Sequence, residues 1–191
     1  MKIGVLGLQG DVREHLRALE SAGATPVVVK HPEEVAAVDA LVVPGGESTT
    51  IGKLMDRFGL LEPIGDRARA GMPVYGTCAG MILMAREVVG EQAAPHRLNL
   101  LDISVRRNAY GRQVDSFESD LDVAGLAGPF RAVFIRAPSV EISGEGVEVL
   151  AAYEGRPVVV VEGPHMASSF HPEMTGDPRV HELFVKKVEA L

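Results

Sequence analysis

The chain has 191 residues, of which 24% are charged and 46% hydrophobic, a balance typical of a globular protein with a sizeable core. Its formal net charge is −7 and it has no run of lysine and arginine, which argues against a nucleic-acid-binding surface. One cysteine cannot form an internal disulfide, and no run approaches the ~20 apolar residues of a membrane span. We therefore expect a soluble protein of the reducing cytoplasm.

The first part of the chain alternates short apolar runs with amphipathic segments. Buried strands are expected at Ile3–Leu8, Pro26–Val29 and Ala40–Val43. After the first strand, Asp11 is expected to cap a helix, with Glu14 completing a capping box. This alternation of strands and helices predicts an α/β fold with a parallel sheet covered by helices.

A tight turn, Pro44-Gly45-Gly46, follows the third strand directly. Ser48 or Thr49 is expected to cap the helix that comes next, at 51–58. Such a turn can aim backbone N–H groups into the space above the carboxyl ends of the strands, where open α/β sheets bind ligands. We interpret it as a candidate oxyanion hole, and the alternative is an ordinary strand-to-helix turn.

The only cysteine stands in the segment Gly76-Thr77-Cys78-Ala79-Gly80, between a predicted strand and a predicted helix. A Gly-x-Cys-x-Gly pattern in this setting is the cysteine form of a nucleophile elbow. The glycines are needed because a Cβ at either position would crowd the neighbouring backbone. A sulfur at a helix N-terminus is favoured as the thiolate. The alternative is a small buried hydrophobic residue.

The second half is richer in short strands and hairpins, which predicts that the sheet is mixed. Segment 91–99 has no clear period and is expected to be a loop. Asp177-Pro178 is expected to start a closing helix, with aspartate as the cap and proline in the first turn. These elements use nearly the whole chain, so we expect one domain over residues 1–191. The expected strands are Phe117–Val123, Phe130–Ile135, Val147–Tyr153 and Pro157–Val161.

Cys78, His171 and Glu173 are the candidate catalytic residues. A thiol nucleophile needs a base, and the base needs a partner that fixes its tautomer and stabilises the imidazolium. Pro172 lies between His171 and Glu173, so we expect a turn at the strand end that lets the carboxylate reach the imidazole. The other five histidines lack such a partner in the sequence, and His165 is the only rival base. No pair among those five has zinc-finger spacing, and no metal is expected.

Three motifs together resemble those of class I, triad-type glutamine amidotransferases: Pro44-Gly45-Gly46, Gly76–Gly80 and Ser169–Glu173. Longer segments are similar to the glutaminase subunits of pyridoxal 5′-phosphate synthases, and the similarity covers essentially the whole chain. Two departures from that pattern, Asp11 and Met174, are not expected to touch the chemistry. The longer segments are Leu8–His15, Gly46–Thr50, Arg107–Gln113, Ser116–Glu118 and Phe134–Pro138.

The resemblance implies a three-layer, flavodoxin-like fold with a mixed sheet and helices on both faces. It implies hydrolysis of L-glutamine to glutamate and ammonia, without a cofactor. The ammonia would pass through a tunnel to a separate synthase subunit, which builds pyridoxal 5′-phosphate from a pentose phosphate and a triose phosphate. The implied assembly has twelve subunits of each kind, and the free glutaminase is weakly active. The residues that match glutamine-binding positions are Gly46, Glu47, Ser48, Arg107, Ile135 and Arg136.

The expected reaction starts when the Cys78 thiolate attacks the side-chain carboxamide of glutamine. The backbone N–H groups of Gly46 and Ala79 are expected to hold the oxyanion. His171 would then protonate the leaving ammonia and activate the water that hydrolyses the thioester. An arginine, either Arg107 or Arg136, is expected to pair with the substrate α-carboxylate.

Two other functions stay open from the residues alone. One is a different cysteine hydrolase on the same sheet, such as a γ-glutamyl hydrolase or a cysteine-dependent stress protein, which would need no partner. The other is a non-catalytic module of flavodoxin type, against which the complete set of candidate catalytic residues argues. A partner is expected to dock near Gln9, the Gly45-Gly46 turn and Asn108–Arg112. Docking could flip the Gly-Gly peptide at low cost and so assemble the oxyanion hole.

Overall fold

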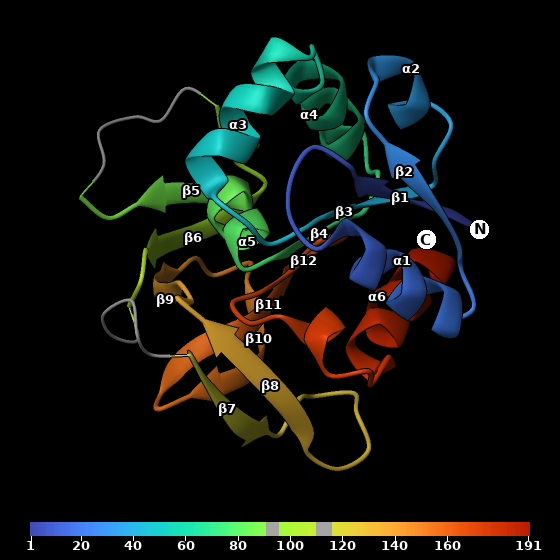
Figure 1. Ribbon diagram of the computed structural model, residues 1–191. Helices are drawn as coiled ribbons and strands as arrows, with labels where there is room; N and C mark the ends of the chain where they lie inside the picture. Colours follow the sequence, from blue (N-terminus) through green and yellow to red (C-terminus); the bar gives the residue numbers. More distant parts are fainter. Residues whose placement is uncertain (91–95, 110–115) are drawn as a thin grey trace.

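The computed structural model describes residues 1–90, 96–109 and 116–191, and its centre is a seven-stranded mixed sheet in the order β10-β11-β12-β4-β3-β1-β2 (Figure 1). The strands from β12 to β2 are parallel, and β10, β11 and β12 pair antiparallel. The bounds are β1 Lys2–Leu6, β2 Thr25–Val29, β3 Ala40–Val43, β4 Val74–Thr77, β10 Glu148–Tyr153, β11 Arg156–Glu162 and β12 His165–Ser168.

Helices cover both faces of this sheet, because successive side chains of its strands point to opposite sides. In β3, Leu41 and Val43 join a core with α2, α3, α4 and α5, whereas Ala40 and Val42 join a core with α1 and α6 (Figure 1). The helices are α1 Val12–Ser21, α2 Pro32–Val35, α3 Ser48–Arg57, α4 Leu61–Arg69, α5 Ala79–Met84 and α6 Arg179–Glu189. The predicted three-layer α/β fold is confirmed.

Two small sheets lie beside the central one. The first has the order β5-β6-β9 and contributes its apolar side chains to the core that contains α3 and α5, and the second pairs β7 with β8 over the core that contains α6. The strands are β5 Ala85–Val88, β6 Leu101–Arg106, β7 Ser116–Leu121, β8 Phe130–Ile135 and β9 Ser139–Ser143. Among the described residues, no helix is long and apolar enough to cross a membrane.

Two of the three predicted helix caps are wrong in detail. Asp11 makes no side-chain capping bond at α1, and Glu14 pairs with Arg13 instead of closing a capping box. At α3 the cap is Glu47, whose carboxylate accepts from two backbone N–H groups, so the helix begins earlier than expected. At α6 the predicted cap is confirmed in its role, because the Asp177 carboxylate accepts from the backbone N–H of Arg179 at 3.0 Å, although the helix begins at Arg179, after Pro178. Segment 91–99 was expected to be a loop, and residues 91–95 of it lie outside the described residues.

Candidate active site

The turn after β4 carries the thiol in a strained backbone conformation. Cys78 has φ 48° and ψ −102°, a region that non-glycine residues rarely adopt, and it directly precedes α5. Its backbone N–H is held by the carbonyl oxygen of Ser168 at 2.8 Å. A Cβ on Gly76 would lie 2.6 Å from the backbone of Gly80, and one on Gly80 would overlap the carbonyl oxygen of Val43. The predicted need for both glycines at this elbow is therefore confirmed.

The Pro44-Gly45-Gly46 turn follows β3, the strand next to β4, so it lies at the same edge of the sheet as the thiol. The N–H of Gly45 donates to the Thr77 side-chain oxygen at 3.0 Å. Gly46 has a φ of +148°, and a Cβ there would lie 2.5 Å from the side-chain oxygen of Gln9. The same oxygen of Gln9 accepts from the Glu47 N–H at 2.9 Å. Two side chains thus hold this turn in place.

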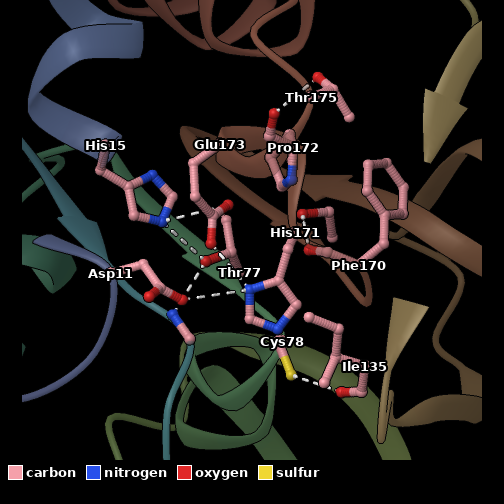
Figure 2. Close-up of polar contacts among 12 residues, drawn as sticks. Asp11, His15, Thr77, Cys78, Ile135, Phe170, His171, Pro172, Glu173 and Thr175 are labelled. Atoms are coloured by element: carbon pink, nitrogen blue, oxygen red, sulfur yellow. Dashed lines mark hydrogen bonds and ion pairs between the residues drawn. The ribbon is translucent and has the colours of Figure 1, made fainter. Parts of the chain in front are cut away.

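His171 and Glu173 follow β12, the strand on the other side of β4. The segment Pro172–Met174 forms a single 3₁₀ turn, which brings Oε1 of Glu173 to 2.8 Å from Nδ1 of His171. Both side chains are buried. His171 and Cys78 line the same cavity, and the sulfur of Cys78 lies 3.8 Å from the carbonyl oxygen of Ile135 (Figure 2). The turn expected from the intervening proline is therefore confirmed.

The charges around His171 favour its protonated form. Burial alone would lower the pKa of His171, but the hydrogen bonds and charges of Cys78 and Glu173 outweigh it and raise that pKa to about 10. A thiolate facing an imidazolium is the arrangement that makes cysteine a nucleophile at neutral pH. The site can therefore carry out both attack and proton transfer.

A cavity of about 270 Å³ opens over the thiol and is lined by all the predicted site residues except Glu173, which lies behind His171. Its lining residues are Asp11, Gly46, Glu47, Ser48, Cys78, Ala79, Ile82, Arg107, Asn108, Ile135, Arg136 and His171. A larger cavity of about 450 Å³ lies beside α4 and is lined by no cysteine or histidine. We therefore place the candidate site at the smaller cavity.

Charged side chains line one side of the smaller cavity. Burial alone would raise the pKa of Glu47, but hydrogen bonds from Thr50 and Thr49 outweigh it and lower that pKa to about 2. The guanidinium of Arg107 lies 3.2 Å from the hydroxyl of Thr49 and 3.9 Å from Glu47. Arg136 is exposed and forms no ion pair with another described residue. Both arginines are thus near enough to meet an anionic group in the cavity.

Asp11 lies closer to the chemistry than expected from the sequence. Its Oδ2 atom lies 3.7 Å from Nδ1 of His171, and its side chain lines the cavity. Candidate metal-ligand atoms of Asp11, His171 and Glu173 lie within 4.8 Å of one another. The Nδ1 atom of His171 is already engaged by Glu173, so this group is better arranged for proton transfer than for holding a metal. The expectation that Asp11 stands apart from the site is wrong.

Sequence reasoning also missed His15. Its Nε2 atom lies 3.4 Å from Oε2 of Glu173, so a second histidine does share the carboxylate, contrary to expectation. The motif Leu8–His15 contained the residue, but nothing in a linear sequence places it beside Glu173. The predicted rival base, His165, lies on β12 outside the cavity lining, and burial lowers its pKa to about 4. Of the predicted docking segment Asn108–Arg112, residues 110–112 lie outside the described residues.

A thiol on an elbow, a paired imidazole and a glycine-rich turn lie at one edge of a mixed sheet, in a fold of the class I glutamine amidotransferase type. A crystal structure of a glutamine amidotransferase superposes with a TM-score of 0.91 at 50% identity, covering 98% of each chain. The structure of PurLQS from Thermotoga maritima shares the fold, with a TM-score of 0.66 at 20% identity, covering 99% of this chain and 95% of that one.

The chain belongs to the SNO glutamine amidotransferase family, which it matches over residues 5–190. A relative from Frankia casuarinae, called pyridoxal 5′-phosphate synthase subunit PdxT, is 60% identical over 99% of this chain and 96% of its own length. A relative with the same name from Mycobacteroides abscessus is 57% identical over 98% of this chain and 97% of its own length.

Proposed function

We propose that this chain hydrolyses L-glutamine to L-glutamate and ammonia, and passes the ammonia to a separate synthase subunit that makes pyridoxal 5′-phosphate. The observation that carries the activity is the convergence of Cys78, His171 and the Gly45-Gly46 turn on one small cavity. Three relatives that match almost the whole chain are each named as a pyridoxal 5′-phosphate synthase subunit, which supports the assignment to that pathway.

Cys78, His171 and Glu173 act as the catalytic triad. The Cys78 thiolate attacks the side-chain carbonyl carbon of glutamine, and the backbone N–H groups of Gly46 and Ala79 stabilise the oxyanion. His171 gives its proton to the departing nitrogen, which leaves as ammonia. The acyl group stays on Cys78 as a γ-glutamyl thioester. His171 then takes a proton from the water that hydrolyses this thioester. Glu173 orients the imidazole and stabilises its charged form.

Glutamine binds with its amide toward the thiol and its amino-acid end toward the charged side of the cavity. The ionised Glu47 is a partner for the α-ammonium group, because the hydrogen bonds from Thr49 and Thr50 already hold its carboxylate in place. Arg107 is held by Thr49, so Arg136 is the guanidinium that needs the least rearrangement to pair with the α-carboxylate. Ser48 and Ile135 complete the predicted set of binding residues around the thiol.

Docking of the synthase subunit acts through the oxyanion turn. Gln9 is the link, because its side-chain oxygen accepts from the Glu47 N–H and lies against Gly46. A partner that contacts Gln9 would release or fix this turn, and a glycine peptide changes orientation at low cost. The cytoplasmic location and the assembly of twelve subunits of each kind stay predictions.

Isotope tracing tests the transfer of ammonia. The chain is mixed with its synthase subunit and both phosphate substrates, and glutamine labelled with ¹⁵N at the amide is the only nitrogen source. We expect ¹⁵N in the pyridoxal 5′-phosphate made by the wild type. Cys78→Ala should make the product from added ammonium but not from glutamine, because the substitution removes the nucleophile and leaves the synthase intact. Equal use of glutamine by Cys78→Ala would contradict the proposal.

A further inference from the structure

A second polar network lies behind the proposed triad, away from the cavity. His15 and His181 are fully buried, and Nδ1 of His15 lies 3.0 Å from Nε2 of His181. The other ring nitrogen of His15 lies 3.1 Å from the hydroxyl oxygen of Thr77 and 3.4 Å from Oε2 of Glu173 (Figure 2). Thr77 is also fully buried and immediately precedes the thiol. The network therefore contacts the triad carboxylate and the elbow at once.

The proton positions in this network follow from its partners. Burial lowers the pKa of His15 well below its ordinary value, and the nearby His181 and His171 lower it further, so the ring is neutral. A lone pair on Nε2 would face the negative carboxylate of Glu173 and would be repelled by it. A proton on Nε2 instead hydrogen-bonds the hydroxyl oxygen of Thr77 and turns the positive end of the N–H toward Oε2 of Glu173, which has no hydrogen-bond partner in the part of the chain that the structure describes. His15 then accepts on Nδ1, so His181 must donate from its own Nε2.

The remaining ring atom of His181 supports the same assignment. Its Nδ1 has no hydrogen-bond partner among the described residues. With the proton of His181 on Nε2, this buried atom is an unsatisfied acceptor, whereas the other tautomer would leave a buried N–H without a partner. Orphaned buried N–H groups are the rarer of the two in folded proteins. The direction of donation therefore runs from His181 to His15 and on to Thr77, with Glu173 facing the same N–H at 3.4 Å.

We propose that His15, held by His181 as its Nε2–H tautomer, is a positioning residue that couples the triad carboxylate to the oxyanion turn. Oε1 of Glu173 is hydrogen-bonded to His171, and Oε2 lies 3.4 Å from Nε2 of His15. His15 therefore restrains rotation of the carboxylate. The hydroxyl oxygen of Thr77 accepts hydrogen bonds from Nε2–H of His15 and from the backbone N–H of Gly45, the first glycine of the turn. One buried imidazole thus touches both parts of the machinery without lining the cavity.

The role rests on the proposed glutaminase function, but its first test does not. In protein with ¹⁵N-labelled histidine, long-range ¹H–¹⁵N spectra show which ring nitrogen carries the proton, and His15→Gln and His181→Gln assign the signals. We expect both rings to be neutral at pH 7, each with its proton on Nε2. A proton on Nδ1 of His15, or a charged His15 ring, would overturn the proposal whether or not the chain hydrolyses glutamine.

The second test separates positioning from mere core packing, using glutamine hydrolysis by the complex with the synthase subunit. His15→Leu removes the donor, whereas His15→Gln places an amide N–H near the former Nε2 position. We expect kcat to fall on the order of 10- to 100-fold in His15→Leu, because small misplacements of catalytic groups are costly. KM for glutamine should stay within about twofold, and His15→Gln should recover most of kcat.

The matched control is His165→Leu, which removes another buried histidine, one that lies outside this network. It should keep the wild-type kcat. A second pair, Thr77→Val and Thr77→Ser, should repeat the pattern, with activity lost in the first and retained in the second. A wild-type kcat in His15→Leu, or losses in His15→Gln and His165→Leu as large as the loss in His15→Leu, would overturn the positioning role. A wild-type complex that hydrolyses no glutamine would instead refute the proposed function.

Discussion

Oε1 of Glu173 lies 2.8 Å from Nδ1 of His171, and a single 3₁₀ turn through Pro172 holds the two side chains in this pairing. Both side chains are buried, so little water competes with the imidazole for hydrogen bonds to the carboxylate. A buried carboxylate paired in this way fixes the tautomer of the imidazole and favours its protonated form. The pairing makes Glu173 a direct target for testing the account.

Replacing Glu173 by glutamine should lower the rate of glutamine hydrolysis about 10²- to 10⁴-fold, because the imidazolium loses its counter-charge. The pKa of His171 should fall toward its ordinary value, so the alkaline limb of the pH–rate profile should move to lower pH. Steady-state kinetics of the complex over a range of pH measures both effects. Glu189→Gln, at an exposed position on α6, is the control. Wild-type kinetics in Glu173→Gln would remove Glu173 from the mechanism.

The pKa of His171 also predicts how stability depends on pH. Its pKa is raised from 6.5 in the unfolded chain to about 10 in the folded protein. The contribution to stability is therefore fully present below pH 6.5 and is lost as the pH rises through about 10. Urea unfolding of wild type and His171→Asn should give free energies of unfolding that converge over this range. A difference in free energy of unfolding between the two proteins that grows with rising pH would contradict a raised pKa of His171.

Glu47→Ala should destabilise the protein by about 1 kcal/mol at neutral pH, because α3 loses its N-terminal cap. The pKa of Glu47 is lowered from 4.5 to about 2, so this contribution is present above pH 4.5 and is lost as the pH falls through about 2. Urea unfolding at neutral and acidic pH measures the change. Glu33→Ala, which removes an exposed carboxylate from the short helix α2, is the control. An effect of Glu47→Ala that is independent of pH would contradict the capping role.

Gly80→Ala should destabilise the fold by about 1–3 kcal/mol, the usual cost of forcing an extra methyl group into a packed site. The new Cβ would overlap the carbonyl oxygen of Val43, which belongs to a central strand and cannot move freely. Gly146→Ala is the matched control, because the nearest atom to its new Cβ would be a side-chain oxygen at 3.4 Å. Thermal unfolding of the two variants compares them. Equal melting temperatures would show that the elbow tolerates a side chain.

Much of this fold is predictable because its information is local. The runs Ala40–Val43 and Pro26–Val29 are apolar over the length of a buried strand, and each lies within or matches a strand of the structure. Cys78 is recognisable from its flanking glycines, which are required because a Cβ on Gly80 would overlap Val43 and one on Gly76 would crowd the backbone of Gly80. The pairing of His171 with Glu173 is local as well, since one turn of chain contains both residues.

The parts that sequence reasoning missed depend on contacts between segments that are distant in the sequence, or on which of several adjacent residues caps a helix. His15 meets Glu173 only because α1 packs beside the turn after β12, and no pattern in either segment encodes that packing. Asp11 reaches His171 for the same reason. At α3, Ser48 and Thr49 are the better caps by residue type, but the carboxylate of Glu47 reaches two backbone N–H groups at once and defines the start of the helix.

The most direct measurement of the central claim is ammonia release from glutamine by this chain, alone and with the synthase subunit, in wild type and Cys78→Ala. The account predicts equal amounts of glutamate and ammonia from the wild type, a faster rate in the presence of the synthase subunit, and no release by Cys78→Ala. Release by Cys78→Ala at the wild-type rate would contradict the assignment of the nucleophile. A rate that is the same with and without the synthase subunit would contradict activation by docking.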